Sequence, residues 1–217
     1  MKRYHYLLAI LISLLLIGCA REIFSADKLP WVSDSSILFM DDFSQTYGGW
    51  TTYTDALSFI GYAKGGFRLA STASNYQFWS VPGLNFIDTQ IHVRAMKLDG
   101  SEDNLYGILC RYQDAGNFYA LVIGSDGYYG IYKMFEGNLA LIDQVHMDFS
   151  EVINRGDEPN DLTAICKGNQ LLLIVNDTRL VQVQDDSLRY GDVGVIAGNF
   201  AEPGVDILFD DFIVIKR

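Results

Sequence analysis

The sequence has 217 residues, of which 49 % are hydrophobic and 13 % aromatic, and its 27 acidic and 16 basic side chains give a formal net charge of −11. This composition suits one globular domain that buries about 70 % of the surface of its unfolded chain. The acidic excess argues against nucleic acid as a partner, because a phosphate backbone is bound by clusters of Lys and Arg.

The N-terminus has the parts of a bacterial lipoprotein signal. Lys2 and Arg3 are positive, residues 6–17 form an apolar stretch shorter than the roughly 20 residues that span a bilayer, and Gly18 precedes Cys19. We expect cleavage before Cys19, acylation of Cys19, and a location on the extracytoplasmic face of the bacterial cell membrane. Cleavage lowers the net charge to about −13, so the anchor is expected to be the acyl chains and not a basic surface.

Three segments are predicted from this pattern. Residues 1–18 are the signal peptide, and residues 19–36, which have no sustained hydrophobic period, are a tether. Residues 37–217 are the domain. Its runs of five to nine residues rich in Val, Ile, Phe, Tyr and Leu are separated by Gly, Asn and Asp, a rhythm typical of an all-β fold with two stacked antiparallel sheets.

The clearest strands follow one another along the chain. In order they are residues 57–63, 67–72, 90–95, 117–124, 128–135, 139–143, 163–167, 170–176 and 179–184, and most are joined by short Gly- or Asn-containing turns. The alternation at residues 90–95 predicts a strand with one wet face, formed by Gln90, His92 and Arg94, with Arg94 pointing outward. The best helix candidate, residues 148–154, is at most two turns long.

Two cysteines remain once Cys19 is assigned to lipid. Cys110 and Cys166 are an even count in an oxidising compartment, so a disulfide between them is the simplest interpretation. The alternative is a pair of buried free thiols, because unpaired cysteine is among the most buried residue types.

A set of short motifs occurs in a fixed order along the domain. They are Asp41-Asp42-Phe43, Gly49-Trp50, Asn117-Phe118-Tyr119, Asp126-Gly127-Tyr128-Tyr129, residues 171–176, residues 191–197 and Phe209-Asp210-Asp211-Phe212. In this order they resemble the concanavalin A-like lectin/glucanase superfamily, and more narrowly its laminin-G-like and 3-keto-disaccharide hydrolase-type domains. The resemblance implies a jelly roll whose first and last strands pair. It leaves function open, because this fold carries many activities.

The residues of a known catalytic centre are not evident in the sequence. Family 16 glycoside hydrolases of this fold carry a Glu-x-Asp-x-x-Glu signature, because two carboxylates must flank one sugar bond, and this chain lacks it. Asp114 and Asp126 fall in predicted turns, so no carboxylate pair is expected to line a cleft. His92 and His146 lack the spacing of a zinc site. The resemblance leaves calcium open at Asp41, Asp42, Asp210 and Asp211, whose alternative role is to protect a sheet edge by charge.

The remaining functional signal is aromatic, because rings can stack on the apolar faces of sugars. About two in three of the rings are expected in the core. Candidate ligand-binding residues are Trp79, Tyr106, Arg111, Tyr119, Tyr129 and Lys133. The sequence thus favours a non-catalytic domain that binds a glycan or an envelope or extracellular protein. The alternatives are a glycan-processing enzyme of the 3-keto-disaccharide hydrolase type and a purely structural envelope lipoprotein.

Overall fold

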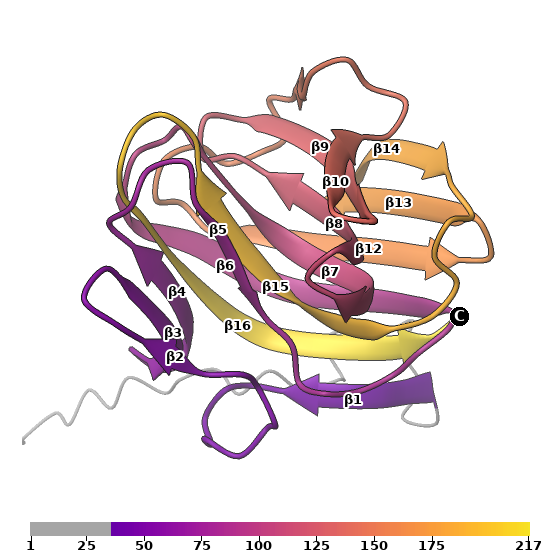
Figure 1. Ribbon diagram of the computed structural model, residues 1–217, viewed down its shortest axis with the longest axis horizontal. Coiled ribbons are helices and arrows are strands. Elements are labelled where there is room, and N and C mark those ends of the chain that lie inside the picture. The colour runs from indigo at the N-terminus through magenta and orange to yellow at the C-terminus, as the bar shows by residue number, and fades with distance from the viewer. Residues whose placement is uncertain (1–35) are drawn as a thin grey trace, which may run out of the picture.

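The computed structural model describes residues 36–217, which form two antiparallel sheets packed face to face (Figure 1). The strands are β1 (Ile37–Asp41), β2 (Tyr53–Thr54), β3 (Ser58–Ala63), β4 (Gly66–Ser71), β5 (Gln77–Ser80), β6 (Thr89–Gly100), β7 (Asn104–Asp114), β8 (Asn117–Ile123), β9 (Tyr128–Phe135), β10 (Asn138–Leu141), β11 (Asp148–Phe149), β12 (Asn160–Lys167), β13 (Gln170–Val175), β14 (Thr178–Gln184), β15 (Asp192–Asn199) and β16 (Val205–Lys216). The predicted all-β sandwich is confirmed.

The predicted signal peptide, Cys19 and the tether as far as residue 35 lie outside the described residues. Within the described part, no helix has the length and apolar character needed to cross a bilayer.

One sheet has nine strands and the other has seven. The nine-stranded sheet runs β14-β13-β12-β6-β16-β4-β3-β2, and β1 is added to it by pairing with β16. The seven-stranded sheet runs β10-β9-β8-β7-β15-β5, and β11 is added to it by pairing with β9. The first and last strands are antiparallel neighbours, with Asp41 opposite Phe212, as the resemblance implied.

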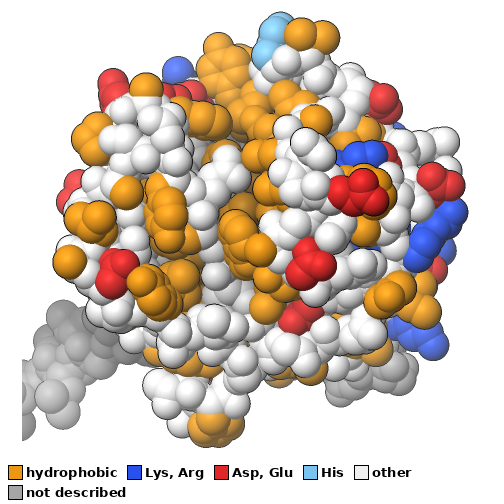
Figure 2. Space-filling model, viewed as in Figure 1, with side chains coloured by type: hydrophobic (Ala, Val, Ile, Leu, Met, Phe, Trp, Pro, Cys, Tyr) orange, Lys and Arg blue, Asp and Glu red, His pale blue; other side chains and the backbone are white. Residues whose placement is uncertain are grey.

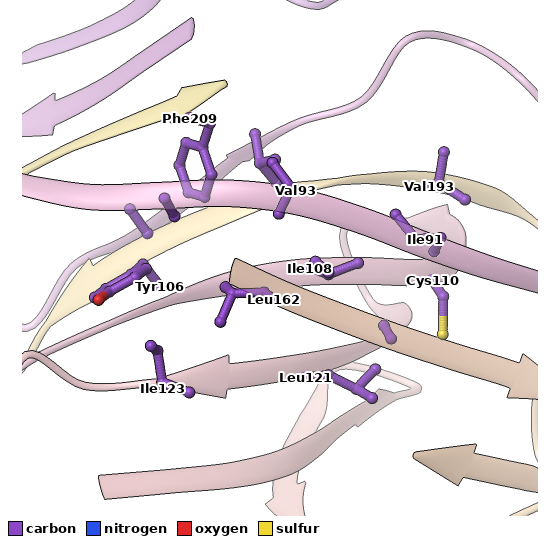
Figure 3. Close-up of a cluster of buried hydrophobic side chains, with 14 of the residues drawn as sticks. Ile91, Val93, Tyr106, Ile108, Cys110, Leu121, Ile123, Leu162, Val193 and Phe209 are labelled. Atoms are coloured by element: carbon purple, nitrogen blue, oxygen red, sulfur yellow. The ribbon is translucent and has the colours of Figure 1, made fainter. Parts of the chain in front are cut away.

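The core lies between the sheets and follows from the alternation of side chains along each strand. Ile108 on β7 and Leu121 on β8 point inward, toward Val93 on β6 and Phe209 on β16, and all four side chains are completely buried (Figure 3). Burying a side chain of this size contributes roughly 1.5–3 kcal/mol to folding. The packed inner faces are therefore the main source of stability.

The edge near β1 is closed by an aromatic cluster. The ring of Trp50 lies 4.9 Å from that of Phe212 and 5.2 Å from those of Phe43 and Phe67. Its Nε1 donates a hydrogen bond to Asp41 Oδ2 at 3.0 Å. The Asp41-Asp42-Phe43 and Gly49-Trp50 motifs therefore act as one structural unit.

One local expectation is wrong. Of the three residues predicted on the wet face of β6, Arg94 is exposed, but Gln90 and His92 are buried. The reason is that β6 lies inside the nine-stranded sheet, where Thr163 on β12 contacts His92 and Arg217 donates a hydrogen bond to Gln90. Residues 148–154 form no helix, because Asp148 and Phe149 pair with β9 as the short strand β11.

A disulfide between Cys110 and Cys166 is present, as predicted, and both side chains are completely buried. Cys110 lies on β7 of the seven-stranded sheet and Cys166 on β12 of the nine-stranded sheet. The bond therefore joins the two layers through the core.

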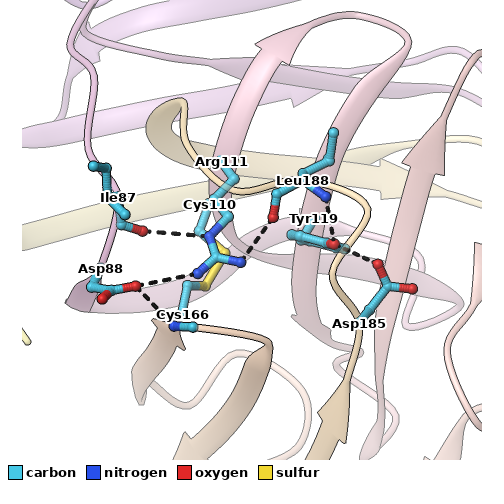
Figure 4. The surroundings of a disulfide bond; sticks show 9 residues. Ile87, Asp88, Cys110, Arg111, Tyr119, Cys166, Asp185 and Leu188 are labelled. Atoms are coloured by element: carbon cyan, nitrogen blue, oxygen red, sulfur yellow. Dashed lines mark hydrogen bonds and ion pairs between the residues drawn. A yellow bond between two sulfur atoms is a disulfide. The ribbon is translucent and has the colours of Figure 1, made fainter.

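Arg111 extends this cross-link to the loops at the same end of the sandwich (Figure 4). Its backbone has a positive φ of 52° at a bulge in β7, and its side chain is 2 % exposed. It donates hydrogen bonds to the carbonyl oxygens of Leu188 at 2.9 Å and Ile87 at 3.4 Å, and it lies 3.5 Å from Asp88 Oδ1. One buried cation thus fixes two connecting segments.

A second network ties the same loop to the seven-stranded sheet. The hydroxyl of Tyr119 donates to Asp185 and accepts a hydrogen bond from the Leu188 amide at 3.1 Å (Figure 4). Lys133 forms an ion pair with the same carboxylate. Burial by itself would raise the pKa of Asp185, but the hydrogen bonds from Lys133, Tyr119 and Ser187 outweigh it and lower the pKa to about 2.

We expect removal of the disulfide to destabilise the domain without changing its fold. For a loop of 56 residues, the chain-entropy model gives a loss of about 4 kcal/mol in the free energy of unfolding. Urea unfolding of the oxidised protein and of the Cys110→Ala/Cys166→Ala double variant measures the difference. Equal midpoints would show that the cross-link contributes nothing.

We expect Asp185→Asn to lower stability at pH 6. The folded-state pKa is lowered, so the stabilisation is present above the ordinary Asp pKa of about 4 and disappears as the pH falls toward 2. The predicted loss is roughly 2 kcal/mol at pH 6 and shrinks at pH 2.5, as followed by urea unfolding. Asp186→Asn is the control, because within residues 36–217 that exposed neighbour pairs only with Arg189 at the surface. A loss that is independent of pH would contradict this account.

Candidate functional site

The six residues proposed from sequence as ligand contacts do not share one surface. Tyr106 and Tyr119 point into the core from β7 and β8 and have no exposed surface, and Arg111 is almost completely buried. A ring without exposed surface cannot stack on a sugar. In this structure these three side chains hold the sandwich together.

Tyr106 belongs to a buried polar network. Its hydroxyl accepts a hydrogen bond from Asn160 Nδ2 at 3.2 Å, and Asn160 also bonds the backbone of Asn154 and the side chain of Asn176. Burial raises the pKa of Tyr106 to about 12, so the hydroxyl stays neutral and its role is hydrogen bonding. The network connects β7 with the segment that precedes β12.

The other three candidates lie on both faces of the seven-stranded sheet. Tyr129 and Lys133 are half-buried on the inner side of β9, where Lys133 is held by Asp185. Trp79, on β5, is the one of the six that lies on the outer side of this sheet. The structure therefore separates Trp79 from the residues with which it was grouped.

The outer side of the seven-stranded sheet carries a second apolar cluster. Its buried members are Leu105, Leu109, Phe118, Ala120, Val122 and Ile196. Seven partly buried side chains cover them, and we call these the outer-face patch: Trp79, Val81, Tyr112, Tyr132, Met134, Met147 and Phe200. The ring of Phe118 lies 5.2 Å from Trp79 and 5.9 Å from Tyr112. Figure 2 shows hydrophobic side chains spread across this face, a feature that marks interaction surfaces in soluble domains.

A hollow of about 580 Å³ opens at one end of this patch. We call it the end hollow, and it is lined by Asp103, Asn104, Asp126, Tyr128, His146, Met147, Asp148, Phe149 and Phe200. It shares Met147 and Phe200 with the outer-face patch. The two features therefore form one continuous surface.

Two exposed rings form the aromatic wall of the end hollow. Tyr128 and Phe149 are 43 % and 44 % exposed, and their ring centroids lie 5.6 Å apart in an edge-to-face arrangement. The pairing of β11 with β9 places them opposite each other. Gly127 makes the contact possible, because its φ is +98° and a Cβ there would lie 2.7 Å from the Phe149 ring.

Three carboxylates also line the end hollow, which corrects the expectation that no carboxylate pair would line a cleft. Asp126 keeps its predicted turn role, since its Oδ1 accepts a hydrogen bond from the Tyr128 amide at 3.3 Å. Burial raises the pKa of Asp126, and the negative charges of Asp103 and Glu102 raise it further against that hydrogen bond. Asp148 accepts a hydrogen bond from Gln144 at 2.9 Å.

The sequence did not reveal this grouping, because its members are far apart along the chain. Asp103 precedes β7 and Asp126 follows β8, and the antiparallel pairing of these strands brings both to one end of the sheet. Phe200 directly follows the last residue of β15. The signal that could have found them is the register of adjacent strands, which no single motif encodes.

The acidic residues considered for calcium have local structural roles. Asp41 accepts hydrogen bonds from the Phe43 amide and from Trp50, and Asp42 accepts one from the Ser44 amide. Asp210 and Asp211 lie at a bulge of β16, where Asp211 has a φ of 55°. Across residues 36–217, no three His, Cys, Asp or Glu side chains are grouped so that they could hold a metal ion.

Comparison with known proteins gives a likeness of fold. No protein-family model matches the sequence, and no curated protein sequence is significantly similar to it. Solved structures do match. The carbohydrate-binding module CBM66 from Bacillus subtilis has a TM-score of 0.64 and 15 % identity, over 77 % of this chain and 96 % of that one.

Two further structures have the same architecture. A protein of unknown function with a galectin-like fold from Bacillus subtilis gives a TM-score of 0.59 at 12 % identity, covering 83 % of this chain and 96 % of that one. The GH43 protein BlXynB from Bacillus licheniformis gives 0.60 at 16 % identity over 82 % of this chain. The match spans 39 % of BlXynB, so the likeness is to one part of that protein. At these identities the comparisons show the fold alone, a two-sheet jelly-roll sandwich.

Proposed function

We propose that this protein is a membrane-anchored extracytoplasmic lipoprotein whose sandwich binds carbohydrate in the end hollow. The observation that carries the proposal is the meeting of two exposed rings, Tyr128 and Phe149, with the carboxylates of Asp103 and Asp126 around one cavity. Its volume of about 580 Å³ lies within the range of small-molecule sites.

The chemistry of the end hollow suits a sugar. The C–H face of a pyranose packs on an aromatic ring, and its hydroxyl groups donate hydrogen bonds to carboxylate oxygens. Asp103 has no side-chain hydrogen bond within the described residues, so its oxygens are available to a ligand. The outer-face patch continues from Met147 and Phe200 and would accommodate further sugar units.

The fold comparison and the N-terminal sequence support the two parts of the proposal separately. A carbohydrate-binding module is among the similar structures and matches over nearly its whole length. The anchor rests on Gly18-Cys19 after a charged start and an apolar stretch. Mass spectrometry of the membrane-extracted protein, which should begin at an acylated Cys19, tests the anchor independently of ligand binding.

We expect Tyr128→Ala and Phe149→Ala each to weaken glycan binding by about tenfold, because each removes a stacking face worth roughly 1.4 kcal/mol. Full-length protein in detergent is first screened on a glycan array, and the best ligand is then titrated by calorimetry. Tyr47→Ala is the control, since Tyr47 is 81 % exposed and lies outside the hollow. Failure to bind any glycan, or equal losses in all three variants, would contradict the proposed site.

A second candidate function, glycan hydrolysis, is favoured by one observation. The raised pKa of Asp126 suits a general acid that protonates the leaving glycosidic oxygen, while Asp103 in the same cavity would activate water or attack the anomeric carbon. Two carboxylates in different environments are the usual arrangement for this reaction.

Turnover of an oligosaccharide panel separates hydrolysis from binding alone. If the domain is a hydrolase, Asp126→Asn and Asp103→Asn should each lower kcat by at least about 100-fold. Asp114→Asn, which alters an exposed turn at the other end of β7, should retain activity. Binding without turnover in the native protein would support the non-catalytic function, and the absence of both would favour a structural envelope role.

A further inference from the structure

We propose that the end of the sandwich opposite the end hollow lies flat against an anionic membrane surface. The contact is a basic and apolar surface, the basal patch, formed by Leu38, Ile87, Arg189, Tyr190, Lys216 and Arg217. The inference rests on the proposed membrane anchor and is independent of whether the end hollow binds sugar.

The first argument is the place where the chain enters the domain. β1 begins at Ile37, which pairs with Ile215, and the next residue, Leu38, lines the same hollow as Lys216 and Arg217. Figure 1 shows the start of β1 beside the C-terminal end of β16. A segment anchored at Cys19 therefore reaches the domain at this end.

The tether by itself leaves the orientation of the domain open. The 18 residues 19–36 could extend to about 60 Å, which is long enough for any side of the domain to face the bilayer. A surface that is attracted to lipid headgroups and lies where the tether enters the domain would favour one orientation. Docking would cost little further entropy, because the tether already holds that end near the membrane.

The second argument is the apolar content of the basal patch. Ile87 is 67 % exposed, Tyr190 is 52 % exposed and Leu38 is 43 % exposed, and together they border a hollow of about 660 Å³. Aliphatic side chains with an adjacent Tyr are typical of surfaces that settle at the boundary of headgroups and acyl chains.

The third argument is charge. In a protein with a net charge of −11, three cations meet in the basal patch. Asp88, the one acidic side chain among the described residues that line the same hollow, is engaged by Arg111 and by the Gly168 amide. Arg189 pairs with Asp186, whereas Lys216 and Arg217 have no ion pair with any residue in 36–217. Such a group attracts phosphate headgroups, while the remaining acidic surface is repelled by them.

The fourth argument is the position of the end hollow. Along β15, Asp192 is near the basal patch and Asn199 is next to Phe200 of the end hollow. Eight residues of strand separate these ends by about 25 Å. Docking through the basal patch would turn the acidic end hollow away from the membrane and toward soluble or cell-surface ligands.

Footprinting on vesicles tests the docking. Full-length lipidated protein is placed in vesicles of phosphatidylcholine alone or with 30 % phosphatidylglycerol, and hydroxyl-radical labelling of Ile87 and Tyr190 is quantified. We expect at least threefold lower labelling with the anionic lipid, reversal by 0.5 M salt, and loss of protection in the Arg189→Glu/Lys216→Glu variant. Equal labelling in both kinds of vesicle would overturn the proposal.

Lys97→Glu is the control, with half the charge change of the double variant. Lys97 lies on β6, eight residues from Thr89, which pairs with Lys216, so the charge reversal is made at the far end of the sandwich. This variant should keep the protection, and loss of protection in it would overturn the assignment to the basal patch.

Flotation of the vesicles tests the lipid anchor separately from the docking. Protein that does not float overturns both anchor and docking, and protein that floats with Ile87 and Tyr190 fully labelled overturns the docking alone. Glycan titration in detergent is unaffected by either result.

Discussion

The architecture depends on the pairing of the last strand, β16, with three others. β6 runs along one edge of β16, while β4 and then β1 occupy its other edge. The change of neighbour takes place at the bulge that contains Asp210 and Asp211, where an inserted residue bends the strand. Because Phe209 and Phe212 on either side of the bulge are both fully buried, the strand keeps contact with the core throughout. The paired acids of this motif are therefore explained by backbone geometry.

The same strand connects the core to the two ends of the molecule. Its final residues, Lys216 and Arg217, contribute to the basal patch, and its pairing with β1 brings the N-terminal segment to that end. The disulfide and the buried Arg111 lie nearby and hold the loops that carry Ile87 and Leu188. Loops fixed by these contacts would keep the shape of the proposed docking surface. The end hollow, by contrast, is built by turns at the far end of the seven-stranded sheet.

The two proposed functions, glycan binding and glycan hydrolysis, would use the same residues of the end hollow. Aromatic rings and carboxylates recognise a sugar, and a carboxylate with a raised pKa can also protonate one. The difference between the two functions lies in whether Asp103 and Asp126 flank a single glycosidic bond. The fold itself does not distinguish binding from hydrolysis, because similar structures include a carbohydrate-binding module as well as part of a GH43 protein.

The amino-acid sequence by itself determined the all-β class and most strand positions, and it favoured a disulfide between Cys110 and Cys166. These features follow from local alternation, turn residues and cysteine count, which act over short stretches or between few partners. The pairing of the terminal strands was implied only by the family resemblance. Only the tertiary structure decided which rings are exposed. Strands β7, β8 and β15 are apolar on both faces. Alternation therefore places Tyr119 and Phe118 on opposite faces of β8, but it does not show which of the two faces is covered by the other sheet. Bulges at Arg111 and Asp211 shift the alternation further. The end hollow itself depends on strand register between distant segments, and register is set by the packing of the whole sandwich.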